Sequence, residues 1–300
     1  MATQPERIAE APGAVRVGLD IGGSSIKAVA SPAHGAPRVI HKLRSQSPGE
    51  AVIDDLVAAA RAVAAGAPLM SVGLTVPGIV QDGIVRACTN VPQLVGLDVV
   101  GELSFVLGVP VTVMNDGLAA ALAEARLGSG DAAADVFVAV LGTGVAGAHV
   151  LDGVMLPGAH GQAGELGHVR VPESCAPCSC GAIGCLETVI GAPALTTAWE
   201  RVTGQPGDLK GLQAAALGGH EAAQAILERA AQALASAMLV LSALVDPGRL
   251  IVGGGVAEAH PQLPARAAEL ARQRATFHHL PELVPAAFGG WSGAVGALLG

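Results

Sequence analysis

The chain has 300 residues, enough for one large or two ordinary domains, and 51% of them are hydrophobic, which leaves ample material for a buried core. Only 14% of the residues are charged, the net charge is −8, and the basic residues form no cluster. A partner with a phosphate backbone, such as DNA or RNA, is therefore not expected.

The N-terminal segment MATQPERIAEAPG contains acids and prolines where a signal peptide would have a basic start and a continuous apolar run. The most apolar long stretch, 230–245, is short for a membrane span and contains Gln232, Ser236 and Ser242. It is more typical of a buried helix. We therefore expect a cytoplasmic protein without a membrane partner.

The first half of the chain begins with short strands. Strand 15–20 ends at an acid that is followed by glycines, and strands 26–30 and 39–43 come next without a helix between them. A dinucleotide-binding βαβ unit would require that helix, so such a domain is not expected. Beyond these strands we predict a helix at 50–65, strands at 70–76 and 109–114 on either side of a loop-rich stretch, and a helix at 118–127.

The second half repeats the pattern of a strand followed by a glycine turn. Strand 135–140 leads into LGTGVAG, and 147–151 is its expected partner strand. Helices at 193–203 and 221–245, a strand at 249–252 and a helix after 290 complete an α/β pattern. We predict two related α/β domains flanking a cleft. The small one is 1–116, completed by the C-terminal helix at about 290–300, and the large one is 117–289.

The glycine turn in DIGGSSIK suits a phosphate, because glycines let backbone N–H groups approach an anion and a nearby acid can hold magnesium through water. An ordinary hairpin turn is the alternative. The string G-x-x-x-x-G-K-[ST] is absent, so the turn is not a P-loop. The candidate nucleotide-binding residues are Asp20, Gly22, Gly23, Ser24, Ser25 and Lys27.

Two further glycine turns also follow apolar strands. LGTG contains Gly142, Thr143 and Gly144, and the threonine hydroxyl can donate to a phosphate oxygen. The third turn, after strand 249–252, contributes Gly254 and Gly255. Each turn could serve packing alone, but three turns after three strands fit one nucleotide held between two domains.

The pair Asn115–Asp116 supplies a candidate catalytic group. Phosphoryl transfer to an alcohol needs a carboxylate that orients the hydroxyl and accepts its proton, and Asp116 is the candidate for that base. The alternative is that Asp116 only caps the helix that begins near Gly117.

A cysteine cluster follows the string GQAGELGHV. Cys178, Cys180 and Cys185 have the spacing C-x-C-x4-C, and His168 lies ten positions upstream of the first of them. Three thiolates and one imidazole complete a tetrahedral zinc site, and a closed site of this kind is structural. A redox site is the alternative, although thioredoxin-like sites have C-x-x-C spacing. Cys175 either competes as a ligand or is idle.

Taken in order, DIGGSSIK, VPG, NDG, LGTG, GELGH and CSCGAIGCLE resemble the ROK family of sugar kinases and sugar-responsive repressors, from about residue 15 to the C-terminus. The resemblance implies an actin-like (ribonuclease H-like) ATPase fold, ATP with Mg²⁺, a structural Zn²⁺ and a homodimer. It implies that Asp116 is the catalytic base and Asn115 a sugar ligand. The other sugar-binding residues it implies are Glu165, His168 (shared with zinc) and Glu187, with Gly78, Thr89 and Asn90 from the first domain.

Two features depart from the family pattern. Where the family has G-G-T-K, the chain has Gly23–Ser24–Ser25 with Lys27 displaced, and polyphosphate-using glucokinases have a similar string but lack the cysteine cluster. ATP therefore remains the expected donor and polyphosphate the alternative. The segment PQL, 92–94, stands where glucokinases of the family often have a tryptophan.

The expected function is phosphorylation of the 6-hydroxyl of a hexose by ATP, with glucose as the first candidate. N-acetylmannosamine, N-acetylglucosamine, mannose and fructose are alternative substrates. A sugar-responsive repressor would need a helix-turn-helix before residue 15, and fourteen residues are too few for one. A sugar-binding relative without catalysis is disfavoured because the base and all three turns are present.

Overall fold

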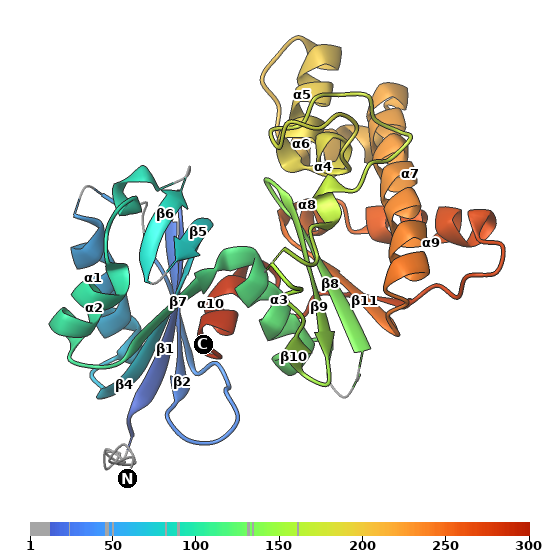
Figure 1. Cartoon of the computed structure of the whole chain (residues 1–300). Helices are drawn as coiled ribbons and strands as arrows, with labels where there is room; N and C mark the ends of the chain where they lie inside the picture. The colour runs from blue at the N-terminus through green and yellow to red at the C-terminus, as the bar shows by residue number, and fades with distance from the viewer. Residues whose placement is uncertain are drawn as a thin grey trace. The chain divides into compact units, whose positions relative to one another are not determined.

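The structure is a computed structural model that describes residues 13–23, 25–45, 48–49, 51–81, 83–88, 91–130, 133, 135–160 and 162–300 (Figure 1). The chain divides into two compact units, each taken by itself below. Unit 1 is the described part of Met1–Ala120 together with Trp291–Gly300, and unit 2 is the described part of Ala121–Gly290. The boundary lies inside helix α3 (Asp116–Leu127), slightly beyond the position predicted from the sequence.

Unit 1 contains a five-stranded mixed sheet with the strand order β3-β2-β1-β4-β7. Its strands are β1 (Val15–Gly22), β2 (Ser25–Pro32), β3 (His41–Arg44), β4 (Leu69–Val76) and β7 (Val111–Asn115). The first two form the predicted antiparallel hairpin without an intervening helix. Strand β4 is parallel to both β1 and β7, so the carboxyl ends of these three strands lie at one edge of the sheet.

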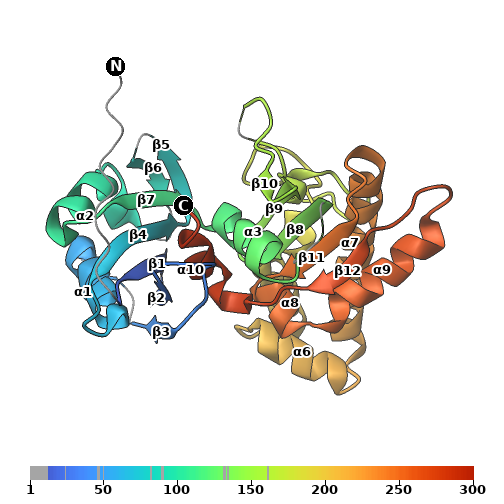
Figure 2. The same cartoon turned by 90° about the horizontal axis from the view of Figure 1, so that it is seen from below.

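Helices cover both faces of this sheet (Figures 1 and 2). Helices α1 (Val52–Ala64) and α2 (Val99–Leu107) lie on one face and α10 (Ser292–Ala297) on the other. Alternate residues of β1 lie on opposite faces of the sheet, because successive side chains of a strand point in opposite directions. Leu19 belongs to the core on the α1 side, whereas a Cβ at Gly18 would lie 2.0 Å from the carbonyl oxygen of Ala294. Only glycine allows so close an approach of α10.

The stretch between β4 and β7, expected to be loop-rich, contains regular structure. Strands β5 (Gly78–Gln81) and β6 (Ile84–Cys88) form a small hairpin. The short 3-10 turn η1 (Pro92–Leu94) and helix α2 come after this hairpin in the chain. The local signals for α2 were present in the sequence. The carboxylate of Asp98 accepts a hydrogen bond from Gly101 N at 2.8 Å, and Gly108 ends the helix in the left-handed conformation, with φ 70°.

Unit 2 contains a second five-stranded sheet, with the order β10-β9-β8-β11-β12. Its strands are β8 (Asp135–Leu141), β9 (Val145–Leu151), β10 (Val154–Met155), β11 (Arg249–Gly253) and β12 (Glu282–Pro285). As in unit 1, an antiparallel hairpin is extended by parallel strands: β8 pairs with β9 on one side and with β11 on the other. The repeated pattern in the sequence therefore corresponds to a repeated sheet topology.

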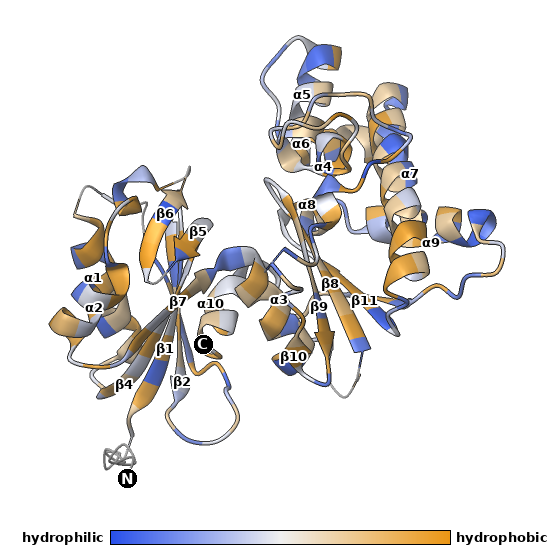
Figure 3. Cartoon of the chain, viewed as in Figure 1, coloured by the Kyte–Doolittle hydropathy of each residue, from blue (hydrophilic) through white to orange (hydrophobic). Residues whose placement is uncertain are grey.

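Helices pack around this sheet and include α4 (Glu187–Ile190), α5 (Ala192–Thr203), α6 (Leu209–Leu217), α7 (Glu221–Leu244), α8 (Gly255–Ala259) and α9 (Gln262–Arg274). By length and composition alone α7 could cross a membrane, but 56% of its most apolar window is buried within the protein. Leu234 and Met238 of α7 belong to the same core as Leu250 of β11. Figure 3 shows the apolar residues along α7 and the strands of this unit. Packing in this core accounts for the apolar character of α7.

Candidate active site

Polar residues gather where the parallel strands of unit 1 end. In the sheet register Asp20 of β1 lies beside Thr75 of β4, and Asn115 of β7 lies beside Val76 of β4. Asp116 follows directly as the first residue of α3. The strand topology therefore brings together an acid from the first glycine turn and the candidate base, which are far apart in the sequence.

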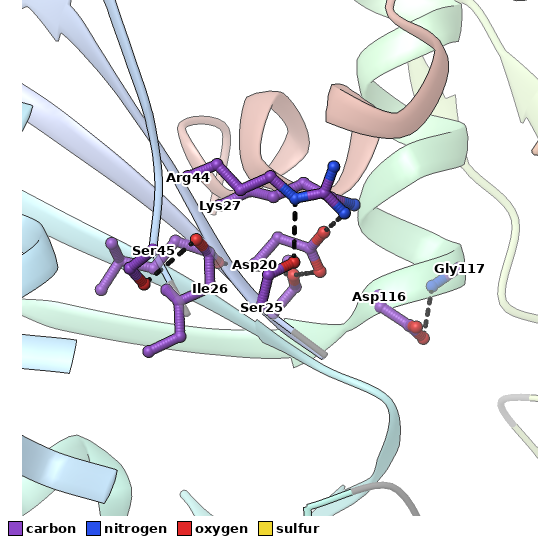
Figure 4. A network of polar contacts seen from close by, with 10 residues as sticks. Asp20, Ser25, Ile26, Lys27, Arg44, Ser45, Asp116 and Gly117 are labelled. Atoms are coloured by element: carbon purple, nitrogen blue, oxygen red, sulfur yellow. Dashed lines mark hydrogen bonds and ion pairs between the residues drawn. The ribbon is translucent and has the colours of Figure 1, made fainter. Parts of the chain in front are cut away.

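The carboxylate of Asp20 is held from both sides (Figure 4). Lys27 Nζ donates to Oδ2 at 3.2 Å. The fully buried Thr75 donates its hydroxyl to Oδ1 at 3.0 Å. Helix α10 adds close packing, because a Cβ at Gly293 would lie 2.9 Å from Cγ of Asp20. Asp20 is thus an oriented, mostly buried carboxylate. The sequence identified Asp20 and Lys27 but not Thr75, whose only signal was a hydroxyl residue near the end of an apolar strand.

A second cation flanks the first glycine turn. Arg44 lies opposite Lys27 in the β2–β3 register, and its Nε donates to the hydroxyl of the buried Ser25 at 3.2 Å (Figure 4). Gly22 ends β1 at this turn, with Gly23 beside it, and Ser24 is outside the described residues. The sequence reasoning missed Arg44, which immediately follows the strand predicted at 39–43. Two cations beside backbone amides suit an anionic ligand.

Asn115 caps helix α3 through two amides, and Asp116 shares only the first of them. Oδ1 of Asn115 accepts hydrogen bonds from Gly117 N at 2.9 Å and from Leu118 N at 3.2 Å, and its Nδ2 donates to Gly78 O at 3.1 Å. Both ends of the Asn115 amide are therefore used to fix the strand-to-helix turn, and Gly78 is brought to the same place. Thr89 and Asn90, the other two residues expected near the sugar in this unit, are outside the described residues.

Asp116 is a partly buried carboxylate at the start of α3. Burial raises the pKa of Asp116 from 3.8 to about 6, and the negative charge of Asp20 acts in the same direction. The hydrogen bond from Gly117 N to Oδ1, at 2.8 Å, and the positive charge of Lys27 oppose this rise. A carboxylate with a pKa near 6 is ionised at neutral pH and is still basic enough to accept a proton.

In unit 2 the second and third glycine turns lie side by side. They follow β8 and β11, which are parallel and adjacent, so both turns are at the same edge of the sheet. Gly254 has φ +91°, and a Cβ at this position would lie 2.4 Å from the carbonyl oxygen of Leu141, immediately before Gly142. Gly255 then begins helix α8. The two turns predicted to bind phosphate are therefore packed against each other.

The predicted metal ligands converge at one point of unit 2. The ligand atoms of His168, Cys178, Cys180 and Cys185 all lie within 4.8 Å of one another. Cys178 Sγ is 3.7 Å from His168 Nδ1, and Cys180 Sγ is 3.7 Å from Cys185 Sγ. Ligand atoms around a tetrahedral zinc with Zn–S near 2.3 Å are roughly 3.7 Å apart, so the spacing fits that metal. The exposed Cys175 is not part of the group.

The predicted sugar-binding residues of unit 2 surround this cluster. Nε2 of His168, the ring nitrogen that faces away from the thiols, lies 3.8 Å from Oε2 of Glu165. Glu187 follows Cys185 by two residues and begins helix α4, and its Oε2 accepts a hydrogen bond from Val145 N at 2.9 Å. The cluster and the two carboxylates thus form one continuous group next to the LGTG turn.

Comparison with known proteins places this arrangement in a family. The sequence model of the ROK family matches residues 16–299. The chain is 32% identical over 269 residues to a glucokinase of Halalkalibacterium halodurans, covering 81% of each chain. It is also 32% identical over 291 residues to an N-acetylmannosamine kinase of Escherichia coli, covering 94% of this chain and 96% of the relative.

Among solved structures, a ROK family glucokinase from Streptomyces griseus in complex with glucose and AMPPNP superposes with a TM-score of 0.79 at 27% identity, covering 95% of this chain and 98% of that one. The predicted α/β class and actin-like fold are therefore confirmed. Because the sequence model of the ROK family matches residues 16–299, the chain belongs to the ROK family.

Proposed function

We propose that the chain is an ATP-dependent sugar kinase that phosphorylates the 6-hydroxyl of a hexose, with glucose as the first substrate to test. The main support for this proposal is that Asp116 is an oriented carboxylate with a raised pKa. Its neighbour Asn115 caps the helix, and burial raises the pKa of Asp116 to about 6. Such a carboxylate is suited to accept the proton of an alcohol. The kinases among its relatives support the same reaction class.

The proposed step is a direct transfer. The hydroxyl oxygen of the sugar attacks the γ-phosphorus of ATP while its proton passes to the carboxylate of Asp116, and the bond from the γ-phosphorus to the bridging oxygen breaks to release ADP. Gly117 N donates to Oδ1 of Asp116 and fixes the orientation of the carboxylate. The base is therefore positioned before any substrate binds, which reduces the entropic cost of reaching the reactive geometry.

The charged groups near the first turn suit the phosphate side of the reaction. Bound Mg²⁺ would neutralise part of the phosphate charge and polarise the γ-phosphoryl group. Asp20 is oriented to accept hydrogen bonds from the water shell of such an ion, and Lys27 holds its carboxylate in place by pairing with Oδ2 at 3.2 Å. The backbone amides of the first glycine turn and the guanidinium of Arg44 supply further positive potential for phosphate oxygens.

A structural zinc is the metal that best fits the four-ligand cluster. A closed site of three thiolates and one imidazole leaves no position for a reacting water, so its role is to fix the segment that carries Glu165 and Glu187. We propose that these two carboxylates accept hydrogen bonds from sugar hydroxyls. We further propose that the protein acts in the cytoplasm as a homodimer.

N-acetylmannosamine is the second substrate to test, because the E. coli relative named for it matches more of the chain than the glucokinase does. Polyphosphate is the alternative donor, suggested by the string Gly23–Ser24–Ser25. A sugar-binding regulator without catalysis is the alternative of another class. The positioned base with a raised pKa favours the enzyme over that regulator.

The test is an assay of ADP release with ATP and Mg²⁺ against glucose, mannose, fructose, N-acetylglucosamine and N-acetylmannosamine, with a reaction lacking sugar as background. Polyphosphate replaces ATP in a parallel series, and NMR of the product identifies the phosphorylated hydroxyl. Turnover on at least one sugar with a 6-phosphate product supports the proposal. Tight sugar binding without turnover from either donor contradicts it and favours the regulator.

A further inference from the structure

The carboxylate of Glu187 is bonded to the second glycine turn. Its Oε2 accepts a hydrogen bond from Val145 N at 2.9 Å, immediately after the segment Gly142–Gly144. The approach is close, because a Cβ at Gly144 would lie 2.8 Å from the same oxygen. A residue expected only to bind sugar therefore also contacts the turn predicted to bind phosphate.

A backbone contact reinforces this connection. Ala192 N, just after helix α4, donates to Gly142 O at 2.9 Å. The start of α4 is in turn fixed to the metal cluster, because the hydroxyl of Thr188 donates to the carbonyl oxygen of Cys185 at 2.7 Å. The segment that carries the metal ligands is thus connected to the turn on both sides of α4.

The remaining amides of the turn are available to a ligand. Gly142 N donates to Gly144 O at 2.9 Å, within the turn, and Val145 N donates to Glu187. Neither Thr143 N nor Gly144 N donates to any residue that the structure describes. Consecutive backbone N–H groups in a turn form an anion-binding concavity when their conformation is fixed. The bond to Glu187 fixes the residue immediately after them.

We propose that Glu187 is a positioning residue for the phosphate-binding turn: its hydrogen bond to Val145 N holds the amides of Thr143 and Gly144 in the conformation that binds a nucleotide phosphate. The metal-bound segment then controls nucleotide binding as well as sugar binding. This inference rests on the proposed kinase function. It assigns Glu187 a role that binding of sugar hydroxyls alone does not require.

The experiment compares Glu187→Ala with Glu187→Gln, in zinc-loaded protein and without sugar. Glutamine keeps an oxygen that can accept the hydrogen bond from Val145 N, whereas alanine does not. We expect Glu187→Ala to accelerate hydrogen exchange of the 142–146 amides and to weaken binding of Mg-ADP, each by about tenfold, since a bond to a charged acceptor is lost. Glu187→Gln keeps a neutral acceptor and should lose clearly less than Glu187→Ala in both measurements.

Two further variants separate positioning from a general disturbance. Glu165→Gln makes the same chemical change in the other carboxylate, which has no hydrogen bond to the turn among the described residues, and it should leave exchange and nucleotide affinity unchanged. Gly144→Ala displaces the Glu187 carboxylate sterically. It should weaken Mg-ADP binding in the wild type and have little further effect in the Glu187→Ala background, because the two substitutions break the same contact.

The outcomes distinguish this inference from the function on which it rests. Wild-type binding of Mg-ADP with unchanged exchange and affinity in Glu187→Ala would overturn the positioning role and leave the kinase proposal intact. Equal losses in Glu187→Gln and Glu187→Ala would show that the charge, and not the hydrogen bond, matters, and would also overturn it. Wild-type protein that binds no nucleotide would overturn both.

Discussion

Asn115 and Asp116 are adjacent in the sequence but have separate tasks. The side chain of Asn115 accepts from the two amides at the start of α3 and donates to Gly78 O, so it performs the capping that either residue could have provided. Asp116 receives a hydrogen bond only from Gly117 N among the other described residues. This division of roles leaves a carboxylate, rather than an amide, available for chemistry at the end of β7.

The raised pKa of Asp116 predicts the pH dependence of turnover. The base must be ionised, and burial raises the pKa of Asp116 to about 6, so kcat/KM should be constant above about pH 7 and fall about tenfold per pH unit well below pH 6. The measurement is a profile of kcat/KM from pH 5 to 8 with a buffer series of constant ionic strength. A flat profile down to pH 5 would contradict the assignment of Asp116 as base.

The same pKa predicts that Asp116→Asn stabilises the protein above pH 6. The carboxyl of Asp116 has a higher pKa in the folded state than its unfolded value of 3.8, so protonation favours the folded state. This contribution to the free energy of unfolding is complete below pH 3.8 and is lost as the pH rises through about 6. At pH 7.5 the neutral amide should increase the free energy of unfolding by up to about 3 kcal/mol, given about 1.4 kcal/mol per pKa unit.

Urea unfolding of the wild type and Asp116→Asn at pH 7.5 and pH 4.5 measures this difference. The gap in stability between the two proteins should shrink at the lower pH, where the wild-type carboxyl is protonated. A variant that is less stable than the wild type at pH 7.5 would show that the ionised carboxylate makes a favourable contact that the structure does not explain.

Loss of the metal should affect unit 2 and the sugar together. Cys178→Ser and Cys185→Ser remove buried ligands, and each should reduce bound zinc well below one equivalent, lower the melting temperature and raise the KM for sugar. Cys175→Ser is the matched control, because this thiol is exposed and outside the cluster. Metal analysis and thermal unfolding test the prediction, and equal zinc loss in Cys175→Ser would be evidence for a different ligand set.

Thr75 should be needed for the orientation of Asp20. Thr75→Val keeps the shape of the side chain but removes the hydroxyl that donates to Asp20 Oδ1, and loss of a buried bond to a charged acceptor should cost about 1.5–3 kcal/mol of stability. Thr75→Ser keeps the hydroxyl and should lose less. Urea unfolding of both variants, with Mg-ADP affinity as a second readout, makes the comparison. Equal losses would attribute the effect to packing instead.

Much of the fold could be predicted because the local signals were strong. The strands before the three glycine turns, helix α1, helix α7 and the hairpin opening all follow from hydrophobic periodicity and glycine placement. Helix α2 was missed even though Asp98 and Gly108 mark its ends, because its apolar residues lie next to a hairpin that is rich in similar residues.

The candidate site was predictable where the chemistry is concentrated in one segment. His168 and the three cysteines lie within eighteen positions, so their convergence could be anticipated from spacing alone. Thr75 and Arg44 could not, because their relation to Asp20 and Ser25 depends on strand pairing between distant segments. The same holds for the hydrogen bond from Val145 N to Glu187, which joins residues 42 positions apart.

The most direct test of the central claim separates sugar binding from turnover in Asp116→Asn. Calorimetry gives the affinity for the preferred sugar, and ADP release with ATP and Mg²⁺ gives kcat. The account predicts sugar affinity within a few fold of the wild type and a kcat reduced by a factor of about 10² or more, because only the proton acceptor is removed. Retention of wild-type kcat with intact sugar binding would contradict the role of Asp116 and, with it, the proposed mechanism.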